Sequence, residues 1–127
     1  MKLKRILYVE DEPDIQAVAR VALELVGGFE IRVCSHGAEA LQQVRDFAPD
    51  LVLLDVMMPG MDGPATLQRL RADPATAHIP VIFLTAKVQE SEVALYQAMG
   101  ALNVIAKPFD PMTLADQVRR IWSEAHG

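Results

Sequence analysis

The stretch LVLLDVMMPGMDG, residues 51–63, is the strongest single indication of how this chain folds. Its first four residues, Leu51–Leu54, are all apolar, which is typical of a short strand buried on both faces. The strand then delivers a carboxylate, Asp55, and three methionines, a proline and two glycines follow. An acid at the tip of a buried strand, ahead of a stiff apolar loop, indicates that the strand end has a function.

Four more runs of the same kind occur along the chain. They are Ile6–Val9, Glu30–Cys34, Pro80–Leu84 and Leu102–Ala106. Each of the five runs is followed by apolar residues at helical spacing. The expected buried helix faces are Ile15, Val18, Ala19, Ala22 and Leu25; Ala40, Leu41, Val44, Phe47 and Ala48; Leu67 and Leu70; Ala94, Leu95 and Ala98; and Leu114, Ala115, Val118, Ile121 and Trp122.

The residues between these runs agree with the assignment. Pro13 and Pro111 are expected at first helical positions, with Asp110 as an N-cap. Gly27-Gly28 and Gly100 are expected to end the first and fourth helices. Five strand–helix units predict an α/β protein, with a doubly wound five-stranded parallel sheet and five helices. The 127 residues, 1–127, are expected to form one domain.

Composition excludes several classes of protein. The net charge is −5 and the pI is about 5.1, which argues against direct contact with nucleic acid. No apolar run approaches the roughly 20 residues of a membrane span. The N-terminal MKLKRILYVEDEP does not resemble a signal peptide, and the single cysteine, Cys34, suits a reducing compartment. We therefore expect a cytoplasmic protein without a membrane partner.

Polar side chains are expected to gather at one edge of the sheet. In open parallel sheets the site lies outside the carboxyl ends of the strands. There the first strand runs into Glu10-Asp11, the third ends in Asp55, the fourth in Thr85-Ala86 and the fifth in Lys107-Pro108. If strands one and three are neighbours, Glu10, Asp11 and Asp55 converge.

Such a cluster of carboxylates needs a cation or a proton. Two unit charges about 4 Å apart repel by about 4 kcal/mol at an effective dielectric constant near 20. Mg²⁺ is satisfied by one or two carboxylates and usually completes its shell with waters and phosphate oxygens. Lys107 would add a positive charge and Thr85 a hydroxyl donor, so the set describes a cradle for a phosphoryl group. Asp55 can then be the nucleophile that accepts it.

The segments YVEDEP, LVLLDVMMPGMDG, IPVIFLTA and NVIAKPF together resemble the receiver domain of bacterial two-component response regulators, the CheY-like family. The resemblance runs from about Ile6 to Trp122, with every motif in order. It implies the flavodoxin-like strand order 2-1-3-4-5. It also implies Mg²⁺ or Mn²⁺ as cofactor and, as partner, a sensor histidine kinase or a histidine phosphotransfer protein.

The resemblance further assigns roles to single residues. Asp55 matches the phosphoacceptor, Thr85 the switch hydroxyl and Lys107 the phosphate-binding lysine. Asp11 would bind the metal directly, Glu10 mostly through water, and Met57 through its backbone carbonyl. Ala86 matches a small residue that leaves access to the site. The Lys107–Pro108 bond matches a cis peptide, and Pro59-Gly60 matches the turn after the acceptor.

The sequence departs from the family pattern in two ways. Many family members carry Asp-Asp where this chain has Glu10-Asp11. Val104 stands where many carry an aromatic residue that moves with the threonine, so we expect the switch to rely on Thr85 and the fourth helix, where Tyr96 could substitute. Met57 and Lys87 occupy positions that tune the lifetime of the phosphorylated form. An apolar methionine there predicts slow self-hydrolysis.

Several readings stay open at this point. A downstream protein would bind the face made by the fourth helix, fifth strand and fifth helix, with the chain a monomer or weak dimer. The chain is either a stand-alone regulator or a receiver cut from a hybrid kinase or larger regulator. A flavodoxin-like FMN carrier, a haloacid-dehalogenase-type phosphatase and a receiver that is never phosphorylated are the alternatives. We expect no turnover of a free metabolite.

Overall fold

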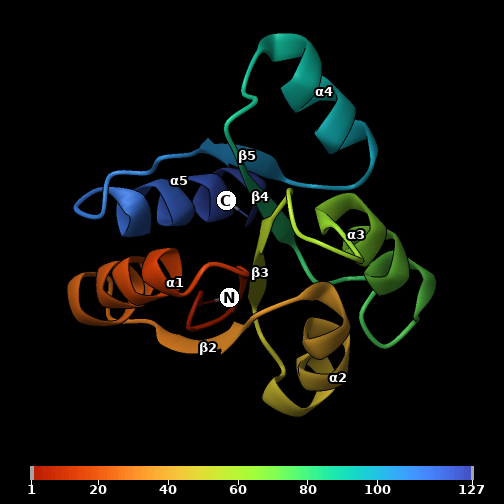
Figure 1. Cartoon of the computed structure of the whole chain (residues 1–127), viewed down its shortest axis with the longest axis horizontal. Helices are drawn as coiled ribbons and strands as arrows, with labels where there is room; N and C mark the ends of the chain where they lie inside the picture. The colour runs from red at the N-terminus through yellow and green to blue at the C-terminus, as the bar shows by residue number, and fades with distance from the viewer. Residues whose placement is uncertain (1, 127) are drawn as a thin grey trace.

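The computed structural model describes residues 2–126 as a parallel sheet between layers of helices (Figure 1). The strand order is β2-β1-β3-β4-β5, and every neighbouring pair is parallel. The strands are β1 Arg5–Val9, β2 Glu30–Cys34, β3 Leu51–Asp55, β4 Val81–Thr85 and β5 Asn103–Ala106. The predicted fold class and strand order are therefore confirmed.

The helices cover both faces of the sheet. They are α1 Pro13–Arg20, continued by a π-helical segment η1 Val21–Val26, then α2 Gly37–Phe47, α3 Gly63–Ala72, α4 Glu90–Ala98 and α5 Leu114–His126. In Figure 1, α1 and α5 lie on one side of the sheet and α2 and α3 on the other, while α4 lies next to the β4–β5 end. Two separate apolar cores result.

Strand alternation divides the side chains between these cores. In β1, Ile6 and Tyr8 face α1 and α5, whereas Leu7 and Val9 face α2 and α3. The central strand β3 follows the same rule and is buried along its whole length. This explains why residues 51–54 are uniformly apolar rather than alternating. It also fixes the position of the residue that follows them, Asp55.

The predicted buried face of the first helix is wrong at its C-terminal end. Leu25 is 80% exposed and Val18 is 45% exposed, while Leu23, which was not predicted, is fully buried. The π-helical segment η1 explains Leu23 and Leu25, which lie within it, but not Val18, which precedes it in α1 and lines a surface groove. A π-helix has a wider turn than an α-helix, so residues counted at α-helical spacing rotate out of register with the core.

The predicted face of the fourth helix is also wrong. Ala94, Leu95 and Ala98 are exposed, and the partly buried apolar residues of α4 are Val93 and Tyr96. Small and large apolar residues occur around this short helix, so spacing did not single out one face.

Other differences concern element ends and two predicted face positions. Leu41 is only partly buried, and Ala48 is exposed in a left-handed conformation that caps α2. Residues 111–113 form a turn, in which Asp110 accepts from the backbone of Met112, and α5 begins at Leu114 rather than Pro111.

Within residues 2–126, no helix has both the length and the apolar character that a bilayer crossing requires.

Candidate functional site

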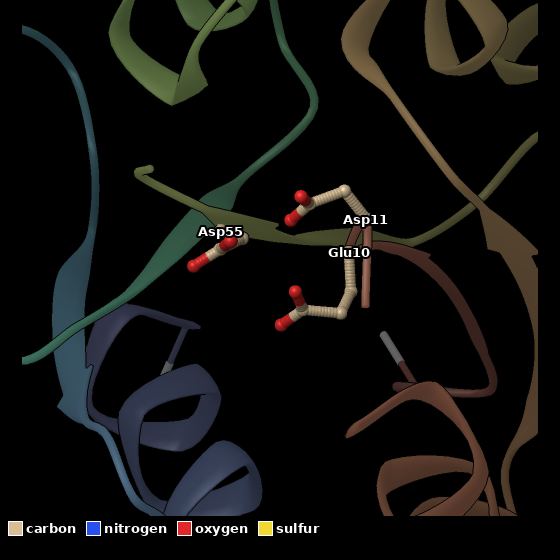
Figure 2. A group of neighbouring side chains, drawn as sticks. All are labelled: Glu10, Asp11 and Asp55. Carbon is tan, nitrogen blue, oxygen red and sulfur yellow. The ribbon is translucent and has the colours of Figure 1, made fainter. Parts of the chain in front are cut away.

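Three carboxylates from two strand ends meet at the carboxyl edge of the sheet. Glu10 and Asp11 follow β1, and Asp55 ends β3, the neighbouring strand. One oxygen from each lies within 4.8 Å of the others, and Figure 2 shows the three side chains turned toward a common space. Glu10 is fully buried, Asp55 is 2% exposed, and Asp11 is half-buried. The predicted convergence of these acids is confirmed.

Lys107, from the end of β5, closes the cluster. Its ammonium donates to Asp55 Oδ1 at 2.9 Å and to Glu10 Oε1 at 3.0 Å. The peptide bond between Lys107 and Pro108 is cis, as the resemblance implied. One cation therefore stands against three anions, and the site carries a net negative charge before any ligand arrives.

Burial and the hydrogen bonds within the cluster shift the pKa values of Glu10, Asp55 and Lys107. Burial raises the pKa of Asp55 and of Glu10 above their ordinary values, and the hydrogen bonds from Lys107 only partly oppose this. Burial also acts to lower the pKa of Lys107, but its hydrogen bonds to both carboxylates outweigh burial and raise it. A second positive charge in the site would therefore stabilise the ionised forms of both acids.

The apolar loop after Asp55 is anchored by Met58 and by close backbone packing. Met58 is buried in the core under α2 and α3, while Met57 is 75% exposed. Gly60 has a positive φ of 74°, which suits the predicted turn. A Cβ on Gly63 would lie 2.6 Å from the carbonyl oxygen of Asp55, so only glycine lets α3 begin this close to the site. This loop therefore holds the backbone around Asp55 in place.

Thr85 and the residues after it form another wall. Thr85 ends β4, is buried, and its Oγ1 accepts from the backbone N–H of Lys87 at 3.1 Å. Within the described residues its hydroxyl makes no hydrogen bond to the carboxylates. Ala86 and Lys87 are exposed at the rim. The effect of Met57 and Lys87 on the lifetime of a phosphoryl group stays a prediction.

Val104 is partly buried beside β4, and an aromatic side chain from α4 lies nearby. Val104 pairs with Phe83 in the sheet, and the ring of Tyr96 packs edge-on against Phe83 with centroids 5.1 Å apart. Tyr96 and Val104 thus contact the same part of the core. That Tyr96 replaces the missing aromatic residue stays a prediction. Such a role would use the contact of Tyr96 with Phe83, which pairs with Val104 in the sheet.

Sequence reasoning missed the residues that hold Glu10. The Tyr8 hydroxyl donates to Glu10 Oε1 at 3.4 Å, and the backbone N–H of Glu12 donates to Glu10 Oε2 at 3.3 Å. The side-chain amide of Gln16 donates to the carbonyl of Glu10 and to Ser35 Oγ. Strand alternation could have identified Tyr8, because residues two apart share a face.

An apolar groove of about 250 Å³ opens beside Lys107. It lies between α1 and the segment that follows β5, and is lined by Asp14, Ile15, Val18, Lys107, Pro108 and Phe109. Beyond it, the exposed apolar residues Val21 and Leu25 continue along η1. The charged rim and an apolar surface therefore adjoin one another.

A doubly wound sheet with an acidic cluster and a lysine at its carboxyl edge defines the class of protein. The chain belongs to the response regulator receiver domain family, whose model matches residues 6–119. It is thus a receiver domain of two-component signalling.

Individual proteins that the chain resembles are also named as response regulators. The DNA-binding response regulator MtrA of Mycolicibacterium smegmatis is 40% identical over 116 residues, which cover 91% of this chain and 49% of that protein. The structure of a response regulator from Desulfuromonas acetoxidans has a TM-score of 0.82 at 31% identity, covering 95% of this chain and 98% of that one. Chemotaxis response regulator CheY4 of Vibrio cholerae has a TM-score of 0.86 at 27% identity, covering 94% and 99%. The chain spans about half the length of the curated relatives it matches.

Proposed function

We propose that this chain accepts a phosphoryl group on Asp55 from a phosphohistidine of a sensor histidine kinase or a histidine phosphotransfer protein. The main support for the proposal is the position of the Lys107 ammonium. It bridges the buried carboxylates of Asp55 and Glu10, and the carboxylate of Asp11 lies beside them. In the transfer, an oxygen of Asp55 forms a bond to phosphorus. The N–P bond of the donor breaks, and the imidazole leaves with the electron pair.

The residues around Asp55 would divide the work. The Lys107 ammonium would turn toward the phosphoryl group and donate to one of its oxygens. The Thr85 hydroxyl would turn from its local bond with the Lys87 N–H to donate to another. Ala86, with its small side chain at the rim, would leave room for the donor. Lys107 and Thr85 would stabilise the negative charge that develops during transfer, which is the dominant means of catalysis for this reaction type.

The donor set fits a magnesium ion. Oxygen ligands alone, with one or two carboxylates bound directly in a partly open site, are what Mg²⁺ selects. Asp11, Asp55 and the backbone carbonyl of Met57 would hold Mg²⁺, or Mn²⁺ in its place, with Glu10 acting through water. When bound, the ion would supply the positive charge that offsets the carboxylates and the phosphoryl oxygens.

Phosphorylation would then change a surface. Helix α4 contributes no fully buried residue to the core, and its Leu95 is 59% exposed. A helix attached this weakly is readily shifted by a change in the loop that joins it to Thr85. We propose that a downstream protein reads the face formed by α4, β5 and α5.

The test of this function is phosphorylation by a small donor. The purified chain is incubated with acetyl phosphate and Mg²⁺, and its intact mass is measured. We expect a gain of one phosphoryl group, and no gain when the metal is removed with a chelator. An unchanged mass with both reagents present would contradict the proposal.

The groove beside Lys107 is suited to the phosphodonor partner, because that partner must bring its phosphohistidine to Asp55. Val18 lines the groove and is 45% exposed, so Val18→Glu should leave the fold intact while placing a charge on the apolar surface. We expect phosphotransfer from a phosphorylated histidine phosphotransfer protein that serves the wild type to fall about ten-fold.

Two comparisons make the groove experiment specific. Labelling of Val18→Glu by acetyl phosphate should match the wild type, because the small donor needs no docking surface. Leu95→Glu, on the exposed side of α4, should transfer normally from the protein donor. Equal transfer to Val18→Glu and the wild type would remove the groove from the donor interface.

We propose a cytoplasmic domain that turns over no free metabolite and contacts no nucleic acid itself. Relatives such as MtrA are named as DNA-binding response regulators, and a segment outside this chain would supply that activity if the whole protein shares it. The acidic residues after β1 would repel the phosphate of FMN, which argues against a flavin carrier.

A further inference from the structure

A buried tyrosine lies at the floor of the acidic cluster. Tyr8 is in β1 and is fully buried, with Val33 and Leu53 as its neighbours across the sheet. Because side chains two residues apart in a strand share a face, Tyr8 lies directly beneath Glu10. A buried tyrosine hydroxyl normally has a hydrogen-bond partner. Among residues 2–126 the only side-chain partner of Tyr8 is Glu10 Oε1, at 3.4 Å.

Glu10 depends on three donors from the chain. Its Oε1 accepts from Tyr8 and from Lys107, and its Oε2 accepts from the backbone N–H of Glu12. The strongest of these is the ammonium of Lys107, at 3.0 Å. Under the proposed function, Lys107 turns toward the phosphoryl group. Glu10 Oε1 is then left, still fully buried, with the Tyr8 hydroxyl alone among these donors.

We propose that Tyr8 is a positioning residue, whose hydroxyl holds the Glu10 carboxylate in place for the metal and frees Lys107 to bind the phosphoryl group. This inference deepens the proposed function and rests on it. It also gives a reason for glutamate at position 10. The extra methylene of glutamate, relative to aspartate, brings the carboxylate down to the hydroxyl.

The test removes only the hydroxyl. Tyr8→Phe keeps the ring that fills the core, and Tyr96→Phe, the other tyrosine of the chain, is the matched control. Mg²⁺ affinity is measured by titration calorimetry. Loss of a group that orients a metal ligand typically weakens binding by 10-fold or more, so we expect the Kd for Mg²⁺ to rise about ten-fold in Tyr8→Phe. It should be unchanged in Tyr96→Phe.

A double-mutant cycle separates positioning from general loosening. In Glu10→Asp the shorter side chain withdraws the carboxylate from the hydroxyl. Adding Tyr8→Phe to that variant should therefore change the Kd less than about two-fold. Equal Mg²⁺ affinity in Tyr8→Phe and wild type would overturn the inference, as would the same loss in both backgrounds.

The second readout is the rate of labelling by acetyl phosphate at saturating Mg²⁺. We expect Tyr8→Phe to be slower than the wild type even with the metal site filled, because release of Lys107 from Glu10 is less favourable. Equal rates would overturn the part of the inference that concerns Lys107. Failure of the proposed function is distinguishable, since the wild type itself would then gain no phosphoryl group while the Mg²⁺ titrations could still differ.

Discussion

Asp55→Asn is expected to abolish phosphoryl incorporation, leaving an intact mass that does not change with acetyl phosphate and Mg²⁺. The asparagine amide keeps the size and position of the side chain but is not a nucleophile toward phosphorus. It also replaces the charged oxygen that accepts from the Lys107 ammonium with a neutral amide oxygen, and it removes one of the three carboxylates of the cluster. The expected loss is complete, because the only other carboxylate among the described residues that accepts from Lys107 is Glu10, whose oxygens also accept from Tyr8 and from the backbone N–H of Glu12.

Asp62→Asn provides the matched control for this variant. Asp62 lies in the loop after β3, is exposed, and caps α3 by accepting from the backbone N–H of Ala65. Asparagine is an equally good N-cap, so the fold should be retained. We expect Asp62→Asn to be labelled like the wild type. Full labelling of Asp55→Asn would mean that another side chain is the acceptor.

The second large expected effect is a pH dependence of the free energy of unfolding when Mg²⁺ is absent. The pKa values of Asp55 and Glu10 are raised in the folded state above the ordinary values of 3.8 and 4.5. The folded chain therefore binds more protons than the unfolded chain over this range. These two groups favour the folded state fully below pH about 4, and that contribution is lost as pH rises through their folded-state pKa values.

The measurement is urea unfolding in a chelator at a series of pH values from 4 to about 8. Other acids act in the opposite direction; Asp73, for example, has a pKa lowered by its hydrogen bond with Arg45. The wild type is therefore compared with Asp55→Asn. We expect the free energy of unfolding of the wild type to fall relative to that of the variant as pH rises.

Mg²⁺ should reverse this loss at neutral pH. A ligand that binds only the folded state adds about 2.7 kcal/mol at a concentration 100 times its Kd. We expect a gain of this order for the wild type and a much smaller gain for Asp55→Asn at the same Mg²⁺ concentration. A pH-independent difference between the two proteins, or equal stabilisation by Mg²⁺, would contradict the electrostatic description of the site.

Much of the fold could be predicted because local pattern and global packing agree. Leu51–Leu54 is apolar on both faces, and a strand of this kind needs helices on both sides. The α5 face was correct in full, since Leu114, Val118 and Trp122 recur at strict α-helical spacing and all are buried. Parallel strands place their ends at one edge, so the meeting of Glu10, Asp11, Asp55 and Lys107 followed from topology.

The errors have separate physical causes. The π-helical segment η1, which contacts α5 and turns Leu25 outward, was not predicted, because apolar spacing was counted at the α-helical period. The inward face of α4 carries Val93 and Tyr96, and the ring of Tyr96 packs against Phe83, a contact that the spacing of apolar residues does not predict. The Tyr8 hydroxyl was missed because an aromatic residue in a strand is first of all a core residue. Strand alternation places Tyr8 and Glu10 on one face, but the hydrogen bond between them depends on the conformations of both side chains.

The acceptor residue is identified most directly by reducing the acyl phosphate, because reduction releases the phosphate and leaves an alcohol at the residue that carried it. The phosphorylated chain is treated with borohydride, which reduces an acyl phosphate to an alcohol, and the peptides are sequenced by mass spectrometry. We predict homoserine at position 55, in the peptide containing LVLLDVMMPG, and unmodified aspartate there when Mg²⁺ is withheld. Aspartate at position 55 in a fully labelled sample, with the phosphoryl group on another residue, would contradict the account.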